Sequence, residues 1–349
     1  PTEEGYYAKL SKAFLKTNFK PISDELVIDC ANGVGAQKLK KLIDYFQENT
    51  LFKPNLCNIG DGILNHNCGA DFVKIRQGPP DGILLKPDVR YASFDGDADR
   101  IVYYYVNPIT SKFCLVDGDK IAILFMLHLK DLFEKLDIAN ELDFCIVQTA
   151  YANGNSTQYI RNVLKVETDC VATGVKNLHH RAKQADVGVY FEANGHGTAL
   201  ISKKTINLIN NLQDSQEKQL LLNFIDLINQ TSGDAISDLL VVETILNNRQ
   251  LSIHEWNSLY SDLPSKQLKV KVADRSVIKT TCDETKCTAP LGLQEIIDST
   301  VSKYGPKARA FVRPSGTEDV VRVYAETETQ EKTDQLANQI AEIIKQQLS

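Results

Sequence analysis

The chain has 349 residues, which corresponds to two or three domains at roughly 150 residues each. Hydrophobic residues make up 43% and charged residues 24%, and these proportions exclude a wholly disordered chain. The formal net charge of −6 argues against a nucleic-acid partner, and no apolar run is long enough to predict a membrane partner. Eight scattered cysteines without a Cys-x-x-Cys spacing predict free thiols and hence a cytoplasmic location.

Strands and helices alternate after an initial helix in the first part of the chain. Pro21 ends that first helix, and Asp117 is a good N-cap for a later one. Repeated strand–helix units of this kind are typical of βαβ folds. The elements expected up to residue 138 are helices at 6–19, 38–46 and 118–133, and strands at 26–28, 91–94 and 101–106.

The same alternation starts again near Asp143 and changes character near Asn247. The elements expected between these points are strands at 144–147, 166–171 and 187–191, helices at 155–164 and 175–184, and a polar loop at 213–218. Beyond Asn247 we expect helices at 253–259 and 291–304, a C-terminal helix, and strands at 268–272, 308–312 and 320–324. The sequence therefore predicts an α/β protein with two mixed-sheet α/β domains followed by a smaller C-terminal α+β domain.

A loop between two expected strands reads Asp95-Gly-Asp-Ala-Asp-Arg100. Three carboxylates this close repel one another, so folding them together requires a cation. Oxygen-only ligands suit Mg²⁺, which makes Asp95, Asp97 and Asp99 candidate metal ligands. A solvated acidic turn is the alternative, and the two apolar flanking strands argue against it.

A second polar loop follows the strand expected at 187–191 and runs from Glu192 through Ala193 to Gly197. The carboxylate of Glu192 and the amide of Asn194 provide acceptors and donors that fit the vicinal hydroxyls of a sugar. His196 is a candidate for proton transfer. A simple Asn-Gly hairpin turn remains an equal alternative for this segment.

A third polar loop lies between the last two expected strands and contains Arg313, Pro314, Ser315, Gly316 and Thr317. An arginine fork grips a phosphate dianion, the two hydroxyls add donors, and the glycine allows backbone N–H groups to turn inward. Arg322 on the following strand adds a second positive charge. A plain β-turn is the alternative.

Two further segments are weaker signals. Gly33-Val34-Gly35 follows a strand but lacks the third glycine of a dinucleotide loop, which favours close helix–strand packing. Lys176 opens a helix after a strand and either reaches into a cleft or belongs to an ordinary loop.

Together, these loops resemble the α-D-phosphohexomutase superfamily, and most closely its eukaryotic branch for N-acetylhexosamine phosphates. The segments 29–35, 64–71 and 148–154 add to the resemblance, which extends from about residue 5 to the C-terminus. The family has four domains around a cleft, and the resemblance assigns domains two to four to this chain. It implies a linker helix at 1–21 from a missing N-terminal domain, a metal-binding domain at 22–138, a sugar-binding domain at 139–247 and a phosphate-binding domain at 248–349.

The resemblance implies a mutase that interconverts N-acetylglucosamine 6-phosphate and 1-phosphate through a sugar 1,6-bisphosphate, with one Mg²⁺, in the synthesis of UDP-N-acetylglucosamine. Its implied substrate-binding residues are Glu192, Ala193, Asn194, Arg313, Pro314, Ser315, Gly316, Thr317 and Arg322. His196, Lys176 and Arg100 are the candidate catalytic residues. The family's catalytic serine lies in a loop reading roughly Thr-Ala-Ser-His-Asn-Pro, and no serine here is followed by histidine and asparagine. We therefore expect a fragment that is inactive by itself and whose partners are a phosphosugar and the missing domain.

Two other functions compete with this interpretation. A haloacid-dehalogenase-type phosphatase also begins with Asp-x-Asp at a strand end, but it leaves the second and third loops unexplained. A non-catalytic phosphosugar-binding protein is the other alternative, and binding without conversion would identify it.

Overall fold

The computed structural model describes residues 2–20, 25–46, 49–316 and 318–348. The chain forms two compact units, each built from two segments. The first unit comprises residues 1–146 and 179–259, and the second comprises residues 147–178 and 260–349. Strand β6 (Phe144–Thr149) and helix α6 (Val175–Ala182) each contribute residues to both units. These units differ from the three predicted domains, whose boundaries stay predictions.

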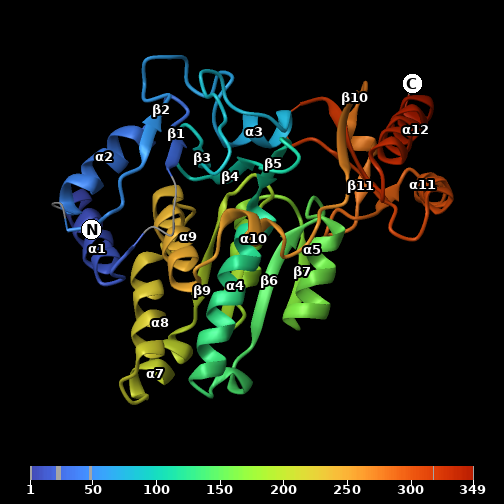
Figure 1. The fold of residues 1–349 in the computed structure, drawn as a ribbon. Helices are drawn as coiled ribbons and strands as arrows, with labels where there is room; N and C mark the ends of the chain where they lie inside the picture. The colour runs from blue at the N-terminus through green and yellow to red at the C-terminus, as the bar shows by residue number, and fades with distance from the viewer. Residues whose placement is uncertain (1, 21–24, 47–48, 317, 349) are drawn as a thin grey trace. The chain divides into compact units, whose positions relative to one another are not determined.

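The first unit contains a mixed sheet, a hairpin and most of the helices (Figure 1). Its elements are α1 (Glu3–Leu15), β1 (Leu26–Asp29), α2 (Gly35–Phe46), β2 (Asn55–Cys57), α3 (Ala70–Arg76), β3 (Arg90–Phe94), β4 (Ile101–Val106), β5 (Phe113–Val116), α4 (Gly118–Lys135), β8 (Val187–Phe191), β9 (Gly197–Ile201), α7 (Lys203–Asn211), α8 (Gln216–Leu227), α9 (Ala235–Arg249) and α10 (Ile253–Asn257). The strands and helices predicted here are confirmed, although α1 ends earlier than expected.

The five-stranded sheet of the first unit has the order β2-β1-β3-β4-β5, with β1 parallel to β2 and β3 and the remaining pairs antiparallel. Both faces of its central strands are covered. Tyr91 and Tyr104 stack on the face packed against α3, with ring centroids 5.4 Å apart. The Tyr103 hydroxyl, from the opposite face, donates to Glu243 on α9 over 3.3 Å. Burial on both faces explains why these strands are apolar at almost every position.

Helix α9 is tied to the sheet by a buried ion pair between Glu243 and Arg90, with 2.9 Å between Oε2 and Nη2. Removing either partner would leave the other charge buried and unpaired, which is strongly destabilising. The pair therefore fixes where α9 lies on the sheet. This matters for function because the N-terminus of α9 supports the aspartate loop at residues 95–100.

Segment 213–218 is predicted to be a loop because it is polar, but only the residues before Gln216 are one. Helix α8 begins at Gln216, and the Ser215 hydroxyl caps it by accepting from the Lys218 N–H over 3.2 Å. Serine before a helix is a standard N-cap, so the polar residues mark the start of a helix.

The second unit is built on the antiparallel sheet β10-β14-β13. Its elements are α5 (Gly154–Tyr159) with a following π turn (Ile160–Leu164), β7 (Glu167–Val171), β10 (Ser265–Lys271), β11 (Lys279–Thr280), β12 (Cys287–Ala289), α11 (Leu293–Val301), β13 (Arg309–Pro314), β14 (Val320–Glu326) and α12 (Gln330–Leu348). Alternate strand residues such as Val312, Val321 and Val323 form a core with α11 and α12. The intervening residues occupy the other face, which carries the candidate phosphate site.

Candidate functional site

The aspartate loop joins β3 to β4 and is held by its backbone. The Val34 N–H donates to the Gly96 carbonyl over 3.0 Å, and the Ala235 N–H at the start of α9 donates to the Ala98 carbonyl over 2.9 Å. A Cβ on Gly33 would lie 2.1 Å from the Gly96 oxygen, so Gly33 packs against this loop and no side chain fits there, whereas the predicted helix–strand packing is found at Gly35, where a Cβ would lie 2.8 Å from the Phe94 ring. These backbone contacts fix the shape of the loop.

Three carboxylates converge at this loop. Asp95, Asp97 and Asp99 each offer an oxygen, and these oxygens lie within 4.8 Å of one another. Burial, and then the negative charges of Asp99 and Asp97, raise the pKa of Asp95 to about 7. The Asp99 Oδ1 atom is buried and accepts no hydrogen bond from the described residues. A clustered, under-satisfied set of oxygen donors fits a hard divalent cation such as Mg²⁺.

Arg100 closes the acidic cluster with a fixed positive charge. Its guanidinium pairs with Asp71, and its Nε lies 3.6 Å from Asp95 and 3.5 Å from Asp99. Burial opposes the charge of Arg100, but the surrounding carboxylates raise its pKa above the usual range. A permanently charged group does not exchange protons, so this geometry suits a counter-ion and not a general acid.

The loop Glu192–His196 is the turn of the β8–β9 hairpin, a geometry that is common to both interpretations of this segment. The Glu192 N–H donates to the His196 carbonyl over 2.8 Å, and Gly195 has a positive φ of 89°. Glu192, Ala193 and Asn194 are partly exposed at its tip. The turn therefore presents the polar groups that are expected to bind a sugar.

The aspartate loop and the hairpin turn touch each other within the first unit. Arg100 and His196 form an isolated β-bridge, and the Ile101 N–H donates to the Gly195 carbonyl over 3.2 Å. The His196 Nδ1 lies 3.5 Å from Asp99 Oδ1. Two loops that lie far apart in the sequence thus lie side by side in the first unit.

The phosphate-loop cations lie in a row across the sheet of the second unit. Arg313 on β13 is directly opposite Arg322 on β14, which is directly opposite Lys269 on β10. Residues directly opposite in antiparallel strands share a face, so three like charges are adjacent. Such a row is unfavourable without anions, and a phosphate group is one anion that fits it.

Two carboxylates partly balance this row. Glu284 lies 3.1 Å from the Arg313 Nε, and Glu318 lies 2.9 Å from the Lys269 Nζ and 3.7 Å from an Arg322 nitrogen. The Arg313 guanidinium also lies 5.9 Å from the ring centre of Tyr151, a distance typical of a cation–π contact. Glu284 and Arg313 are mostly buried, whereas Glu318 is about half exposed.

The other predicted phosphate-loop residues differ in how they are placed. Pro314 ends β13 opposite Val321. The buried Ser315 hydroxyl accepts from the Glu318 N–H over 3.3 Å, which fixes it inside the loop. Gly316 does not have a positive φ and a Cβ there would meet no atom within 4 Å, so its conformation does not demand glycine. Thr317 lies outside the described residues.

Lys176, the third candidate catalytic residue, lies on the first turn of α6 and is exposed. It belongs to the second unit, whereas His196 and Arg100 belong to the first. Within the first unit, the structure brings Arg100 and His196 together.

Sequence analysis does not find several residues around the phosphate loop: Tyr151, Lys269, Arg275 and Glu284. Lys269 is found only once the strand register is known, because it is far from Arg322 in sequence. Arg275 donates to the Glu318 carbonyl over 2.6 Å and so holds the loop backbone. A clustering of basic and acidic residues in 269–284 is the available signal, but it does not specify a site.

All eight cysteines are free thiols, as predicted from their spacing. Within the described residues, no helix combines the length and apolar character needed to cross a membrane.

Three family models match successive parts of the chain. Phosphoacetylglucosamine mutase AMG1 domain II matches residues 2–102 and its domain III matches residues 117–251. The C-terminal domain of phosphoglucomutase/phosphomannomutase matches residues 267–343.

Curated relatives match nearly the whole chain. The phosphoacetylglucosamine mutase of Homo sapiens is 52% identical over 97% of this chain, which covers 64% of the human protein. Phosphoacetylglucosamine mutase 1 of Schizosaccharomyces pombe is 44% identical over 97% of this chain, which covers 67% of that protein. The chain therefore spans about two thirds of the length of these relatives.

Solved structures agree in fold. The N-acetylphosphoglucosamine mutase of Aspergillus fumigatus, solved with GlcNAc-6P and magnesium, has a TM-score of 0.95 and 45% identity, covering 100% of this chain and 66% of that one. A substrate complex of an N-acetylglucosamine-phosphate mutase in the α-D-phosphohexomutase superfamily has a TM-score of 0.93 and 44% identity, covering 99% and 66%. The predicted fold class and the predicted resemblance are confirmed.

Proposed function

This chain belongs to the phosphoacetylglucosamine mutase family, and from that premise we propose that it carries the metal, sugar and phosphate sites of a phosphohexomutase. The reaction is the interconversion of N-acetylglucosamine 6-phosphate and N-acetylglucosamine 1-phosphate through the 1,6-bisphosphate. The Aspergillus relatives solved with GlcNAc-6P and magnesium, and with glucose 1,6-bisphosphate, support this assignment.

Asp95, Asp97 and Asp99 are the residues that would hold Mg²⁺. Mg²⁺, when bound, neutralises charge that develops on a transferring phosphoryl group. The pKa of Asp95 near 7 means that cation binding displaces any proton this carboxyl holds. Arg100 balances the remaining negative charge and keeps the loop compact through its contacts with Asp71 and Asp99.

Glu192 and Asn194 bind the hydroxyls of the sugar from the hairpin tip. Because the turn is bonded to the aspartate loop through Gly195 and His196, the sugar and the reacting phosphate are brought to one place. His196 is the candidate for moving the proton of a sugar hydroxyl, since its imidazole adjoins Asp99.

Arg313, Arg322 and Ser315 hold the phosphate that is not reacting, with Pro314, Gly316 and Thr317 completing the loop. Lys269 adds a third cation to this site. Distal binding of this kind orients the reacting end of the sugar, so its loss lowers turnover as well as affinity.

The phosphoryl donor of the reaction comes from outside this chain, which contains no Ser-His-Asn segment. We assign that role to an N-terminal domain of the complete protein, in keeping with the greater length of the relatives. The chain by itself therefore binds the phosphosugar without converting it. The free thiols support a reducing cytoplasmic location, and the product serves UDP-N-acetylglucosamine synthesis.

The observation that carries this proposal is the contact between the aspartate loop and the hairpin turn in one unit. Isothermal titration calorimetry of the chain in Mg²⁺ tests it, with N-acetylglucosamine 6-phosphate as ligand and N-acetylglucosamine as the control without phosphate. We expect saturable binding of the phosphosugar alone. Absence of binding by the folded chain would overturn the assignment, and release of free phosphate would indicate a dehalogenase-type phosphatase.

A further inference from the structure

Glu284 lies where two loops of the second unit meet. Its Oε2 accepts from the Thr173 N–H over 3.0 Å and from the Thr173 hydroxyl over 2.6 Å. The same oxygen lies 3.1 Å from the Nε of Arg313. The side chain is only 16% exposed, so these contacts are largely shielded from water. One carboxylate thus connects the loop that precedes α6 to the arginine of the phosphate loop.

We propose that Glu284 is a positioning residue for phosphate binding, and this inference rests on the function proposed above. The Glu284 carboxylate lies beside the Nε of Arg313 and so holds the Arg313 side chain in place. The closest approach is to Nε, so the two terminal nitrogens of Arg313 can still face a phosphate group as a fork. The Tyr151 ring supports the same guanidinium from a centre distance of 5.9 Å.

The surroundings of Arg313 explain why an anchor is needed. Arg322 lies directly opposite Arg313, with Lys269 next in the row, so repulsion pushes the Arg313 side chain away from the position in which it serves the substrate. A neighbouring negative charge offsets this repulsion, and hydrogen bonds from Thr173 fix where that charge lies. An arginine fixed in advance loses less side-chain freedom when phosphate binds.

Glu318 provides an internal contrast. It pairs with Lys269 and Arg322, two cations of the row itself, and its side chain is 48% exposed. A half-exposed carboxylate can move aside for phosphate, whereas Glu284 is largely shielded from water and is bonded to Thr173, which lies outside the row of cations. The two carboxylates therefore have different roles, Glu318 as a replaceable counter-ion and Glu284 as a permanent support.

The hydrogen bonds between Thr173 and Glu284 also give the loop around Thr173 a role in phosphate binding. Thr173 stands shortly before Lys176, and the Glu284 carboxylate fixes its backbone and side chain together. Segment 173–176 is a weak signal in the sequence, and the inference places it in the support of the phosphate site.

The experiment compares Glu284→Ala with Glu284→Gln in the 349-residue chain. Glutamine keeps an acceptor oxygen for Thr173 and Arg313 but removes the charge. Glu328→Gln is the matched control, since Glu328 pairs with Lys307 on the surface of the same unit at 3.7 Å. Binding of N-acetylglucosamine 6-phosphate and of inorganic phosphate is measured by calorimetry, and folding is checked by thermal denaturation.

We expect Glu284→Ala to weaken phosphosugar binding about tenfold, because it removes both the counter-charge and the acceptor for Thr173, and Glu284→Gln to weaken it by an intermediate factor of about three, because glutamine keeps the acceptor but not the charge. Equal or tighter binding by the alanine variant would overturn the inference, because Glu284 would then only compete with phosphate for Arg313.

A second variant keeps the test decisive if Glu284→Ala does not fold. Thr173→Val removes one donor to Glu284 with little change of shape, and we expect it to weaken phosphosugar binding while Glu328→Gln does not. Unchanged binding by a folded Thr173→Val chain would contradict the positioning role. Failure of the unsubstituted, folded chain to bind phosphosugar would instead refute the proposed function itself.

Discussion

The aspartate loop and the phosphate loop differ in the charges that they gather, carboxylates in the first and cations in the second. The aspartate loop is fixed by backbone bonds to Val34 and to the start of α9, and the hairpin turn is bonded to its far end. The phosphate loop also has backbone bonds, such as that from the Ser315 N–H to the Val320 carbonyl over 2.9 Å, but its cations are paired with the carboxylates of Glu284 and Glu318. A rigid backbone can hold like charges together until a cation arrives, whereas side-chain pairs can exchange one anion for another.

The glycines show a further difference. A Cβ on Gly195 would lie 1.8 Å from the Ile101 oxygen, and a Cβ on Gly118 would lie 1.9 Å from the Glu192 oxygen. Gly316 in the phosphate loop has open space around it. The first region is therefore intolerant of added atoms and the second is tolerant, so the same substitution should act very differently in the two.

Gly195→Ala should destabilise the chain by about 3–5 kcal/mol, because it combines a positive φ with a backbone clash. Urea denaturation of the purified chain measures the loss, and Gly316→Ala serves as the matched comparison. A stability loss below about 1 kcal/mol for Gly195→Ala would contradict the close backbone contact between the two loops.

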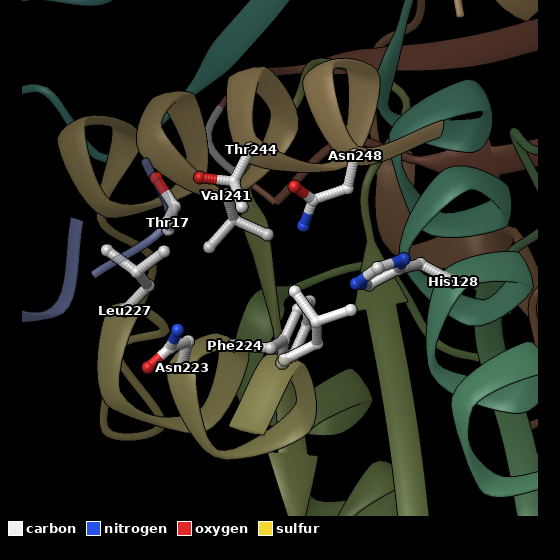
Figure 2. A pocket seen from close by; sticks show the side chains of 9 residues that line it. Thr17, His128, Asn223, Phe224, Leu227, Val241, Thr244 and Asn248 are labelled. Carbon is white, nitrogen blue, oxygen red and sulfur yellow. The ribbon is translucent and has the colours of Figure 1, made fainter. Parts of the chain in front are cut away.

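The helices that support the aspartate loop contain a buried imidazole. His128 on α4 lines a small pocket with Phe224 on α8 and Thr244 on α9 (Figure 2). Burial, and then the charge of Arg249, lower its pKa to about 4. The unfolded chain binds more protons than the folded chain between about pH 4 and the ordinary histidine pKa near 6.5.

Stability should therefore fall as the pH drops from 6.5 to 4, with a contribution from His128 on the order of 3 kcal/mol, and should not depend on this group at higher pH. The free energy of unfolding measured across this range tests the prediction, and His128→Phe should remove this part of the slope. A slope that is the same in both chains would show that His128 does not carry it.

Arg313→Ala should weaken binding of N-acetylglucosamine 6-phosphate by about 1.5–3 kcal/mol, the scale of a charged hydrogen bond. Mg²⁺ binding should be unchanged in this variant, because the aspartates belong to the other loop region. Calorimetry with each ligand separates the two effects. An unchanged affinity for the phosphosugar would show that Arg313 does not bind the phosphate.

Asp97→Asn should weaken Mg²⁺ binding by at least about tenfold, equivalent to ~1.4 kcal/mol, through the loss of one charged ligand. The metal-free variant should be no less stable than the parent chain, since one of three repelling charges is gone. A metal titration identical to that of the parent chain would refute the metal role of this loop.

Gly316→Ala should change the free energy of unfolding by no more than about 0.5 kcal/mol, because its Cβ meets open space. The same denaturation assay as for Gly195→Ala provides the measurement. A large loss here would show that the phosphate loop is as tightly constrained as the aspartate loop.

The parts of the molecule that can be predicted from the sequence are those whose signals are local. The aspartate loop stands between two apolar strands, and Asp117 before a long apolar helix is a recognisable N-cap. Helix α9 gives no such signal, because every residue from Ala235 to Leu246 is buried and no polar face marks its period.

The site residues that sequence analysis does not find depend on long-range pairing. Lys269 joins Arg322 only through the register of β10 with β14, and Glu284 reaches Arg313 from the turn between β11 and β12. The periodicity of a sequence does not show which residues of two strands or loops lie opposite each other, so neither Lys269 nor Glu284 is predicted. Gly316 is predicted to allow an inward turn of the backbone, and the structure shows no positive φ there.

The most direct test of the central assignment is a ³¹P NMR time course of the 349-residue chain with Mg²⁺, N-acetylglucosamine 6-phosphate and a trace of the 1,6-bisphosphate. We predict broadened or shifted substrate signals without any new phosphorus species, because the chain has the binding loops but no Ser-His-Asn segment. Appearance of the 1-phosphate would contradict the assignment of the phosphoryl donor to another domain. Signals that stay unperturbed by the folded chain would contradict the binding site itself.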